Sequence, residues 1–264
     1  MGRAFRAELL KLRRRSVVVA AGSAAFLYAV ITTLVTFLPA KSGPLVVGPR
    51  GIGTTLETLA NPEGATTAFS NAIAFLGVIL LAIFISSVGF EYSRGTFATA
   101  LMKQPRRLRL LGGKIAGLLV FLAATLAVAE AVGWLLALTL APARGISTSA
   151  WFSAVAIREA AAAYGTALFV GGAWACIGMA IAIFTRSVPI ALAIGIAWAG
   201  PGEHLTQEAW AGASRWFPGL LLEAFAVGGN AEASFGRAFA MAAMYVAVLT
   251  TAAFVAFGRR DVTA

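Results

Sequence analysis

The residues that could take part in catalysis are few. The chain has one histidine, His204, flanked by Glu203 and Glu208. An imidazole beside carboxylates can act as a general base or bind zinc, but each role needs a further ligand or a nucleophile at the same place. Glu203 and Glu208 lie in a stretch expected to be exposed at the membrane edge, where an interfacial polar residue is the ordinary expectation, and the single cysteine, Cys176, lies inside an apolar run. The sequence therefore predicts neither a metal site built on cysteines nor an intramembrane enzyme.

Nucleotide chemistry is also not predicted for this chain. Gly112-Gly113-Lys114 lacks the upstream glycine spacing and the following Ser or Thr that a G-x-x-x-x-G-K-[ST] loop uses to hold phosphate and magnesium. We expect a protein that is not an enzyme and binds no cofactor of its own.

Glu130 is the one ionisable residue inside a long apolar run. A carboxylate in the middle of a membrane costs about 2.5–3.5 kcal/mol on insertion scales unless it faces a cavity or a partner. It can therefore line a translocation path or pair across a subunit interface. It can equally be protonated, bonded to a neighbouring helix and purely structural.

The most informative charged stretch runs from Glu91 to Lys114 and separates two apolar runs. Thr96 to Met102 can form about two helical turns. Pro105 is expected to stop this helix, and Gly112-Gly113 to break the chain before the next apolar run. The pattern predicts a short helix presented to a cytoplasmic partner. The alternative is a basic loop that only anchors the topology of the protein.

Composition gives the class of protein. Of 264 residues, 59% are hydrophobic and 12% are charged, and the mean hydropathy is +0.85. Soluble domains have about 25% charged residues, so the chain is predicted to be an integral membrane protein. Its net charge of +10 does not indicate nucleic-acid binding, because the basic residues cluster at the ends of apolar runs.

Residues 1–15 are predicted to form an amphipathic helix in the headgroup layer, with Phe5, Leu9 and Leu12 on its apolar face and membrane lipid as its partner. The apolar run that follows, from Ser16 to Ala40, is longer than the roughly 7–15 residues of a signal-peptide core, so it is interpreted as an uncleaved span.

An all-α membrane fold with six transmembrane helices follows from the apolar runs, with spans at about 16–38, 69–89, 115–141, 160–184, 188–202 and 238–258. A central loop at 90–114 and an outer loop at 142–159 separate neighbouring spans. The fifth span is short for a bilayer, so it either stops early or continues as helix through Glu203, His204 and Glu208. Pro218 and Gly228-Gly229 divide residues 203–237, which are predicted to form a re-entrant or interfacial hairpin on the outer side.

Most of the 21 basic residues fall in the N-terminal segment, the central loop and the C-terminus. Because Lys and Arg remain on the cytoplasmic side, this distribution places both termini in the cytoplasm and the protein in the cytoplasmic membrane.

The chain as a whole resembles the permease subunits of the type-2 ABC exporter family. The resemblance covers nearly the entire chain. It rests on AELLKLRRRS before the first span, on Glu91, Gly95-Thr96, Pro105-x-Arg107 and Lys114 in the inner loop, on the six spans, and on Trp216-Phe217-Pro218-Gly219 before the last span. The long first outer loop, Lys41 to Ala68, is less typical of that family.

The resemblance implies a single permease domain, 1–264, with an elbow helix at 1–15, a coupling helix at about Glu91 to Met102 and an outer hairpin at 203–237. It also implies that a second permease copy or a paralogue pairs with the chain and that a dimer of cytoplasmic ABC ATPase subunits binds the ATP. The residues expected to couple to the ATPase are Glu91, Arg94, Gly95, Thr96, Pro105, Arg107 and Lys114, with Glu91 pairing with Arg94 or Lys114.

The predicted function is export of a substrate across the membrane with ATP hydrolysed by a separate subunit. The alternative is a membrane anchor or assembly factor that transports nothing and recruits a cytoplasmic protein through its basic loop. Co-purification with an ATPase whose turnover it alters would distinguish the two.

Overall fold

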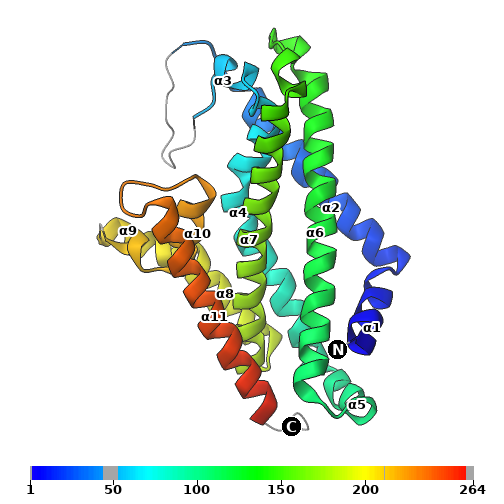
Figure 1. Ribbon diagram of the computed structural model, residues 1–264. Helices are drawn as coiled ribbons and strands as arrows, with labels where there is room; N and C mark the ends of the chain where they lie inside the picture. Colours follow the sequence, from blue (N-terminus) through cyan, green and yellow to red (C-terminus); the bar gives the residue numbers. More distant parts are fainter. Residues whose placement is uncertain (1, 44–52, 211, 260–264) are drawn as a thin grey trace. The chain divides into compact units, whose positions relative to one another are not determined.

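The computed structural model describes residues 2–43, 53–210 and 212–259, and within these ranges every regular element is a helix (Figure 1). In the element names, α marks an α-helix and η marks a short 3-10 or π-helical turn. In chain order the elements are α1 (Gly2–Leu12), α2 (Arg15–Phe37), α3 (Leu56–Ala60), α4 (Gly64–Ser93), α5 (Thr96–Lys103), α6 (Arg107–Leu140), η1 (Pro142–Arg144), η2 (Ser149–Phe152), α7 (Ala154–Thr185), α8 (Val188–Ala197), η3 (Trp198–Gly202), α9 (Glu203–Ala209), η4 (Ala213–Arg215), α10 (Pro218–Ala226) and α11 (Phe235–Arg259).

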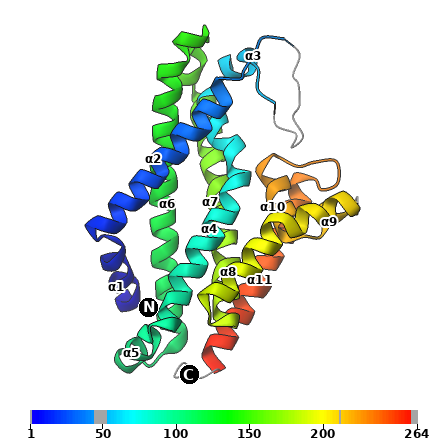
Figure 2. The same cartoon turned by 180° about the vertical axis from the view of Figure 1, so that it is seen from behind.

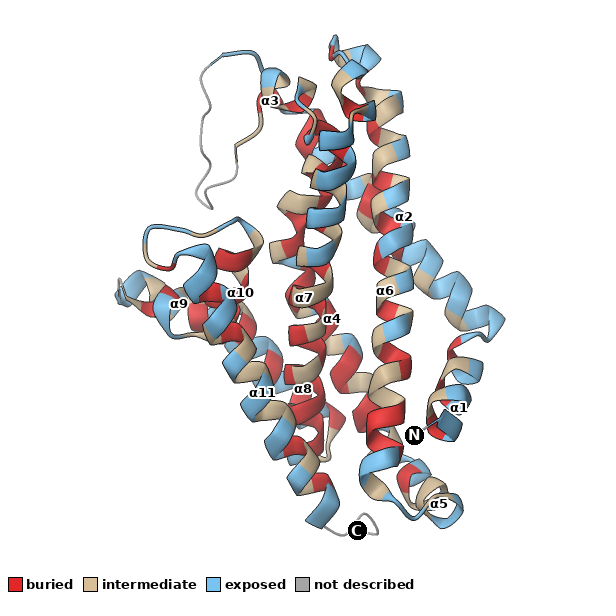
Figure 3. Ribbon diagram, viewed as in Figure 1, coloured by how far each residue is buried: buried red, intermediate tan, exposed pale blue. Residues whose placement is uncertain are grey.

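Five of the described helices are long and apolar enough to cross a membrane: α2, α4, α6, α7 and α11. Such a set fits a multi-pass integral membrane protein. Large apolar side chains are exposed along α2 and α11, as lipid-facing helices require (Figure 3).

The fifth predicted span, 188–202, is not among these five helices. The chain is helical from Val188 to Ala209, but as three consecutive pieces, α8, η3 and α9. Pro201 lies inside η3 and has no N–H to donate, and a π-helical turn is a common way for a helix to accommodate such a defect. The path turns there, so that α9 points away from the direction of α8 (Figure 2).

The prediction that Gly112-Gly113 breaks the chain is wrong, because α6 runs through both residues from Arg107 to Leu140. Both glycines are buried. A glycine inside a helix costs only about 1 kcal/mol, and close packing of neighbouring segments against its bare backbone can offset that cost. The predicted loop at 90–114 is accordingly helical except around Arg94-Gly95 and Gln104 to Arg106.

Other boundaries also shift. α7 begins at Ala154, so Arg158 and Glu159 lie on this helix and not in the predicted loop at 142–159. On α1 the buried residues are Ala4, Glu8 and Leu12, whereas Phe5, Leu9 and Leu12 were predicted to form its apolar face.

The chain divides into two compact units. The first contains Met1–Arg13, Ala74–Phe121 and Phe169–Ala264, and the second contains Arg14–Ile73 and Leu122–Leu168. Helices α4, α6 and α7 contribute residues to both units.

In the second unit, α3, the loop after α6 and the end of α2 pack around Trp151. The indole of Trp151 is fully buried, donates from Nε1 to the carbonyl oxygen of Leu59 at 2.9 Å, and meets the ring of Phe37 edge-on. Gly64 is required beside it, because a Cβ there would lie 1.9 Å from the Leu59 carbonyl oxygen. Part of the segment that was predicted as the long first outer loop, Lys41 to Ala68, is therefore packed structure.

Candidate functional site

Four charged side chains from three helices meet in the first unit. Lys114 of α6 donates to Glu8 of α1 at 2.9 Å and to Glu91 of α4 at 2.5 Å. Lys11 of α1 donates to the same Glu91 oxygen at 2.9 Å and to Glu8 at 3.2 Å. We call Glu8, Lys11, Glu91 and Lys114 the charge cluster.

The charge cluster is largely out of water. The side chains of Glu8, Glu91 and Lys114 are 4%, 13% and 16% exposed. Two cations alternate with two anions, so each buried charge has an opposite neighbour. Breaking such a pair by removing one member costs about 3–5 kcal/mol, since the remaining charge stays buried without compensation.

Lys11 is the most exposed member of the charge cluster. Burial lowers the pKa of Lys11, but attraction to Glu91 and then to Glu8 outweighs it, and the net pKa is raised above 10.5. Lys11 therefore carries its charge throughout the physiological pH range.

Close packing and an apolar wall surround the charge cluster. Gly117 of α6 allows α1 to approach, because a Cβ at this position would lie 3.0 Å from Cβ of Glu8. A cavity of about 10 Å³ remains beside the cluster, lined also by Phe97, Leu111 and Met179. Such a space holds about one water molecule, so this is a joint between helices and not a ligand pocket.

The short helix α5 is attached to this joint by one aromatic side chain. Phe97 is 1% exposed, and its ring centroid lies 4.8 Å from that of Tyr92 on α4 and 5.1 Å from that of Phe257 on α11. Nζ of Lys114 lies 5.6 Å from the Phe97 centroid, within reach of a cation–π interaction. A displacement of α5 therefore acts on α4, α6 and α11 through Phe97.

The turn that begins α5 contains three of the predicted coupling residues. Gly95 has φ of 64°, a left-handed conformation that favours glycine. Thr96 donates from its hydroxyl to the carbonyl oxygen of Glu91 at 3.1 Å, which ties the start of α5 to the charge cluster. The guanidinium of Arg94 lies 5.2 Å from the ring centroid of Phe90. Of the two residues predicted to pair with Glu91, Lys114 forms an ion pair with it in the structure.

Pro105 and Arg107 stand at the other end of α5. Pro105 lies two residues after Lys103, the last residue of α5, so the helix ends before it as predicted, and Arg107 is the first residue of α6. Neither belongs to the charge cluster.

The face of α5 opposite Phe97 is exposed. Thr96, Thr99 and Lys103 lie on it, and the side chain of Met102 is 78% exposed. Nothing in the described part of the chain covers this methionine.

Glu130 lies apart from these residues, in the part of α6 that belongs to the second unit. Its Oε1 is buried and has no hydrogen-bond partner among the described residues. One turn further, Gly133 faces Thr33 of α2, where a Cβ would lie 4.0 Å from the threonine Oγ1.

Two members of the charge cluster, Glu8 and Lys11, were not predicted as site residues. Glu8 is the only acid in a strongly basic segment and lies one turn from both Phe5 and Leu12. A lone carboxylate near the apolar face of a helix is the signal that could have identified it, because such a group needs a cation from another element.

A second group of carboxylates lies where α9 meets α10. Glu203 is 1% exposed and accepts a hydrogen bond from the Leu220 N–H at 2.9 Å, near the start of α10. Gly219 permits this approach, because a Cβ there would lie 2.5 Å from Oε2 of Glu203. Burial, with a smaller contribution from the charge of Glu223, raises the pKa of Glu203 from 4.5 to about 7, against the opposing hydrogen bonds from Leu220 and Gly219.

His204 lies beside this group. Its Nδ1 is 2.8 Å from the carbonyl oxygen of Gly200, and its Nε2 is 3.2 Å from Glu223. Because a carbonyl oxygen only accepts, Nδ1 carries the hydrogen, and a protonated ring can donate to both neighbours. This arrangement ties α10 to the start of α9.

Among the described residues there is no group of three or more His, Cys, Asp and Glu side chains that could hold a metal ion. No protein-family model matches the chain, and no curated protein matches its sequence.

Proposed function

We propose that this chain is the membrane-spanning permease subunit of an ABC exporter, which moves a substrate across the cytoplasmic membrane with ATP hydrolysed by a separate subunit. The observation that carries the proposal is the joint formed by α5 and the charge cluster. A surface helix with an uncovered methionine is connected to four other helices by a buried aromatic ring and by buried ion pairs.

In this proposal α5 is the coupling helix. The ATPase contacts its exposed face at Thr99, Met102 and Lys103 and pushes α5 when ATP closes the ATPase dimer. Phe97 passes the displacement to Tyr92, Phe257 and Lys114, and Lys114 passes it to α1 through Glu8. Because closely packed groups shift as units, the push moves helices and is not absorbed by the loop.

The fifth transmembrane segment of this proposal is α8 together with η3, from Val188 to Gly202, because the path turns before α9. Its 15 residues cover about 22 Å at a rise of 1.5 Å per residue, so the segment stops short of the roughly 30 Å of a hydrocarbon core. Residues 203–237 then form the outer hairpin, with Glu203 binding the start of α10, and α1 serves as the elbow helix. The basic residues near α1, α5 and the end of α11 support a cytoplasmic position for these elements in the proposal.

The proposal is tested by purifying the full-length chain from its native membranes and identifying the proteins that accompany it. We expect an ATPase whose turnover rises at least several-fold when the permease is reconstituted with it. Met102→Glu should abolish the association, because it places a carboxylate in the apolar contact, whereas Met102→Leu should preserve it.

Glu91→Ala is the second arm of the test. It should lower permease-stimulated ATP turnover and export without reducing membrane insertion, because α4 loses its ion pairs with α6 and α1 while the apolar spans stay unchanged. Wild-type stimulation by this variant would contradict coupling through the charge cluster. A stable partner that hydrolyses no ATP would favour the alternative, a membrane anchor that recruits a cytoplasmic protein.

A further inference from the structure

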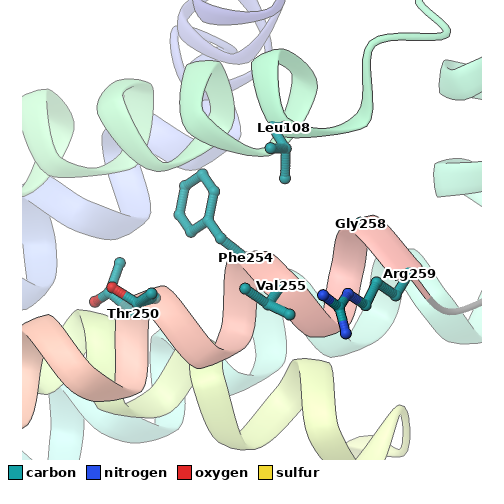
Figure 4. A pocket seen from close by; sticks show the side chains of 7 residues that line it. Leu108, Thr250, Phe254, Val255, Gly258 and Arg259 are labelled. Carbon is teal, nitrogen blue, oxygen red and sulfur yellow. The ribbon is translucent and has the colours of Figure 1, made fainter.

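A groove lies in the first unit between the last turns of α11 and the start of α6 (Figure 4). Its volume is about 400 Å³, and it is lined by Leu108, Thr250, Thr251, Phe254, Val255, Gly258 and Arg259. The volume falls within the roughly 300–1,000 Å³ of small-molecule sites. Phe254 and Leu108 face each other across it from the two helices.

The lining of the groove is apolar along most of α11 and becomes positively charged at the C-terminal end of this helix. Phe254, Val255 and Leu108 make its walls apolar, and the cationic residue Arg259 stands at the end of the helix. Within the described chain Arg259 has no ion-pair partner and is exposed. Arg106 and Arg109, beside Leu108 on the chain, are exposed as well.

The dimensions match one leaflet of a bilayer. From Thr250 to Arg259 the helix advances about 13 Å at 1.5 Å per residue, close to half of the roughly 30 Å hydrocarbon core. α11 is long and apolar enough to span a membrane, so the apolar part of the groove faces acyl chains and its arginine reaches the headgroup level.

We propose that this groove binds a single anionic glycerophospholipid, with one acyl chain between Phe254, Val255 and Leu108 and the phosphate against Arg259. Arg259, with Arg106 and Arg109 nearby on the chain, makes this end of the groove positively charged. This charge favours binding of a lipid with net negative charge over a zwitterionic lipid. The site is separate from the headgroup contacts expected of α1, and it does not depend on the proposed transport function.

The test is native mass spectrometry of the full-length, delipidated protein with equal amounts of phosphatidylglycerol and phosphatidylcholine. The wild type should retain phosphatidylglycerol about fivefold more than phosphatidylcholine. Arg259→Ser should abolish this preference, because the headgroup contact is lost. Gly258→Leu should lower retention of both lipids, because a Cβ at Gly258 already lies 3.5 Å from Leu108 and a longer side chain fills the groove.

Arg237→Ser is the matched control, since it removes an arginine from the opposite end of the same helix and should leave the preference unchanged. Unaltered helicity and gel-filtration behaviour verify folding, and Val255→Trp replaces Gly258→Leu if the latter does not fold. The proposal is overturned if Arg259→Ser keeps the preference, if Arg237→Ser removes it equally, or if filling the groove changes nothing. It is also overturned if Val255→Cys, in a Cys176→Ser background, forms a disulfide between two copies, because a second chain then covers the groove.

Discussion

Lys114 holds two carboxylates that come from different helices. The interaction with Glu91 was one of two pairings predicted for that residue from the sequence, because both residues bound the same charged stretch between two apolar runs. The interaction with Glu8 could not be predicted, because the basic, amphipathic pattern of α1 indicates a helix held by lipid and says nothing of the protein surface it contacts. The sequence therefore identified half of the charge cluster.

Lys114→Met should lower the stability of the protein strongly. Glu8 and Glu91 then stay buried with only Lys11 as a partner, at a cost of about 3–5 kcal/mol. The measurement is the thermal unfolding midpoint in detergent, with Arg109→Met, an exposed position on the same helix, as control.

Partial recovery in Lys114→Met with Glu91→Leu would identify the unpaired carboxylate as the cause, because an apolar replacement of a buried pair is often close to neutral. An unchanged midpoint in the single variant would contradict the buried charge cluster.

Glu203 predicts a pH dependence with a definite sign. Its pKa is about 7 in the folded protein and near 4.5 when exposed, so the folded state binds more protons between these values. Stability due to this residue is therefore highest at low pH, falls as pH rises from about 4.5 to 7, and is then constant. The total effect is at most about 3 kcal/mol.

The corresponding experiment compares unfolding midpoints of the wild type and Glu203→Gln at pH 5.5 and pH 8. The amide imitates the protonated acid, so the variant should show a smaller loss of stability on going to pH 8. Identical pH profiles would show that Glu203 does not titrate in this range.

At the scale of elements, the apolar runs and the Pro and Gly positions predicted most of the helices correctly. The remaining helix boundaries depend on packing between segments. Pro105 ends α5 because its ring cannot continue the helix, a purely local effect. Gly112-Gly113 failed as a breaker because both residues are buried, and burial is not visible in a local pattern. The turn at η3 likewise follows from Pro201, whereas the direction of α9 depends on the contact of Glu203 with α10.

Gly117→Val should displace α1 from α6. Even a Cβ would lie 3.0 Å from Cβ and 3.1 Å from Cγ of Glu8, so two further methyl groups have no space. Amide hydrogen exchange of residues 2–12 should increase at least several-fold, because α1 loses its buried ion pairs.

Gly165→Val on α7 is the control, since a Cβ at that exposed glycine meets nothing within 4 Å. Unchanged exchange in Gly117→Val would mean that α1 does not approach α6 at this residue.

For the whole molecule, hydropathy predicted an all-helical membrane protein, and five of the expected crossings are long apolar helices in the structure. The packed cap around Trp151 was not predicted. It depends on Leu59, Gly64 and Trp151 meeting from segments far apart in sequence, and a Gly-, Pro- and Thr-rich composition indicates only a loop.

The proposed orientation predicts which side of the membrane each loop faces. In a Cys176→Ser background, Met102→Cys should react with an impermeant maleimide only from the cytoplasmic side, and Ser147→Cys only from outside. The assay compares intact cells with inverted membrane vesicles. Labelling of Met102→Cys in intact cells would reverse the topology and remove the basis for an ATPase partner.

The ion pair between Glu8 and Lys114 also bears on biosynthesis. The two residues are 106 positions apart, so at about 5–20 residues per second the ribosome releases the acid about 5–20 s before its cation. During that interval Lys11 is the one of the two ion-pair partners of Glu8 that has already been synthesised. Helix α1 can therefore form its complete set of ion pairs only after the start of α6 has been synthesised. In chains truncated before Lys114, α1 should be cleaved more readily by added protease.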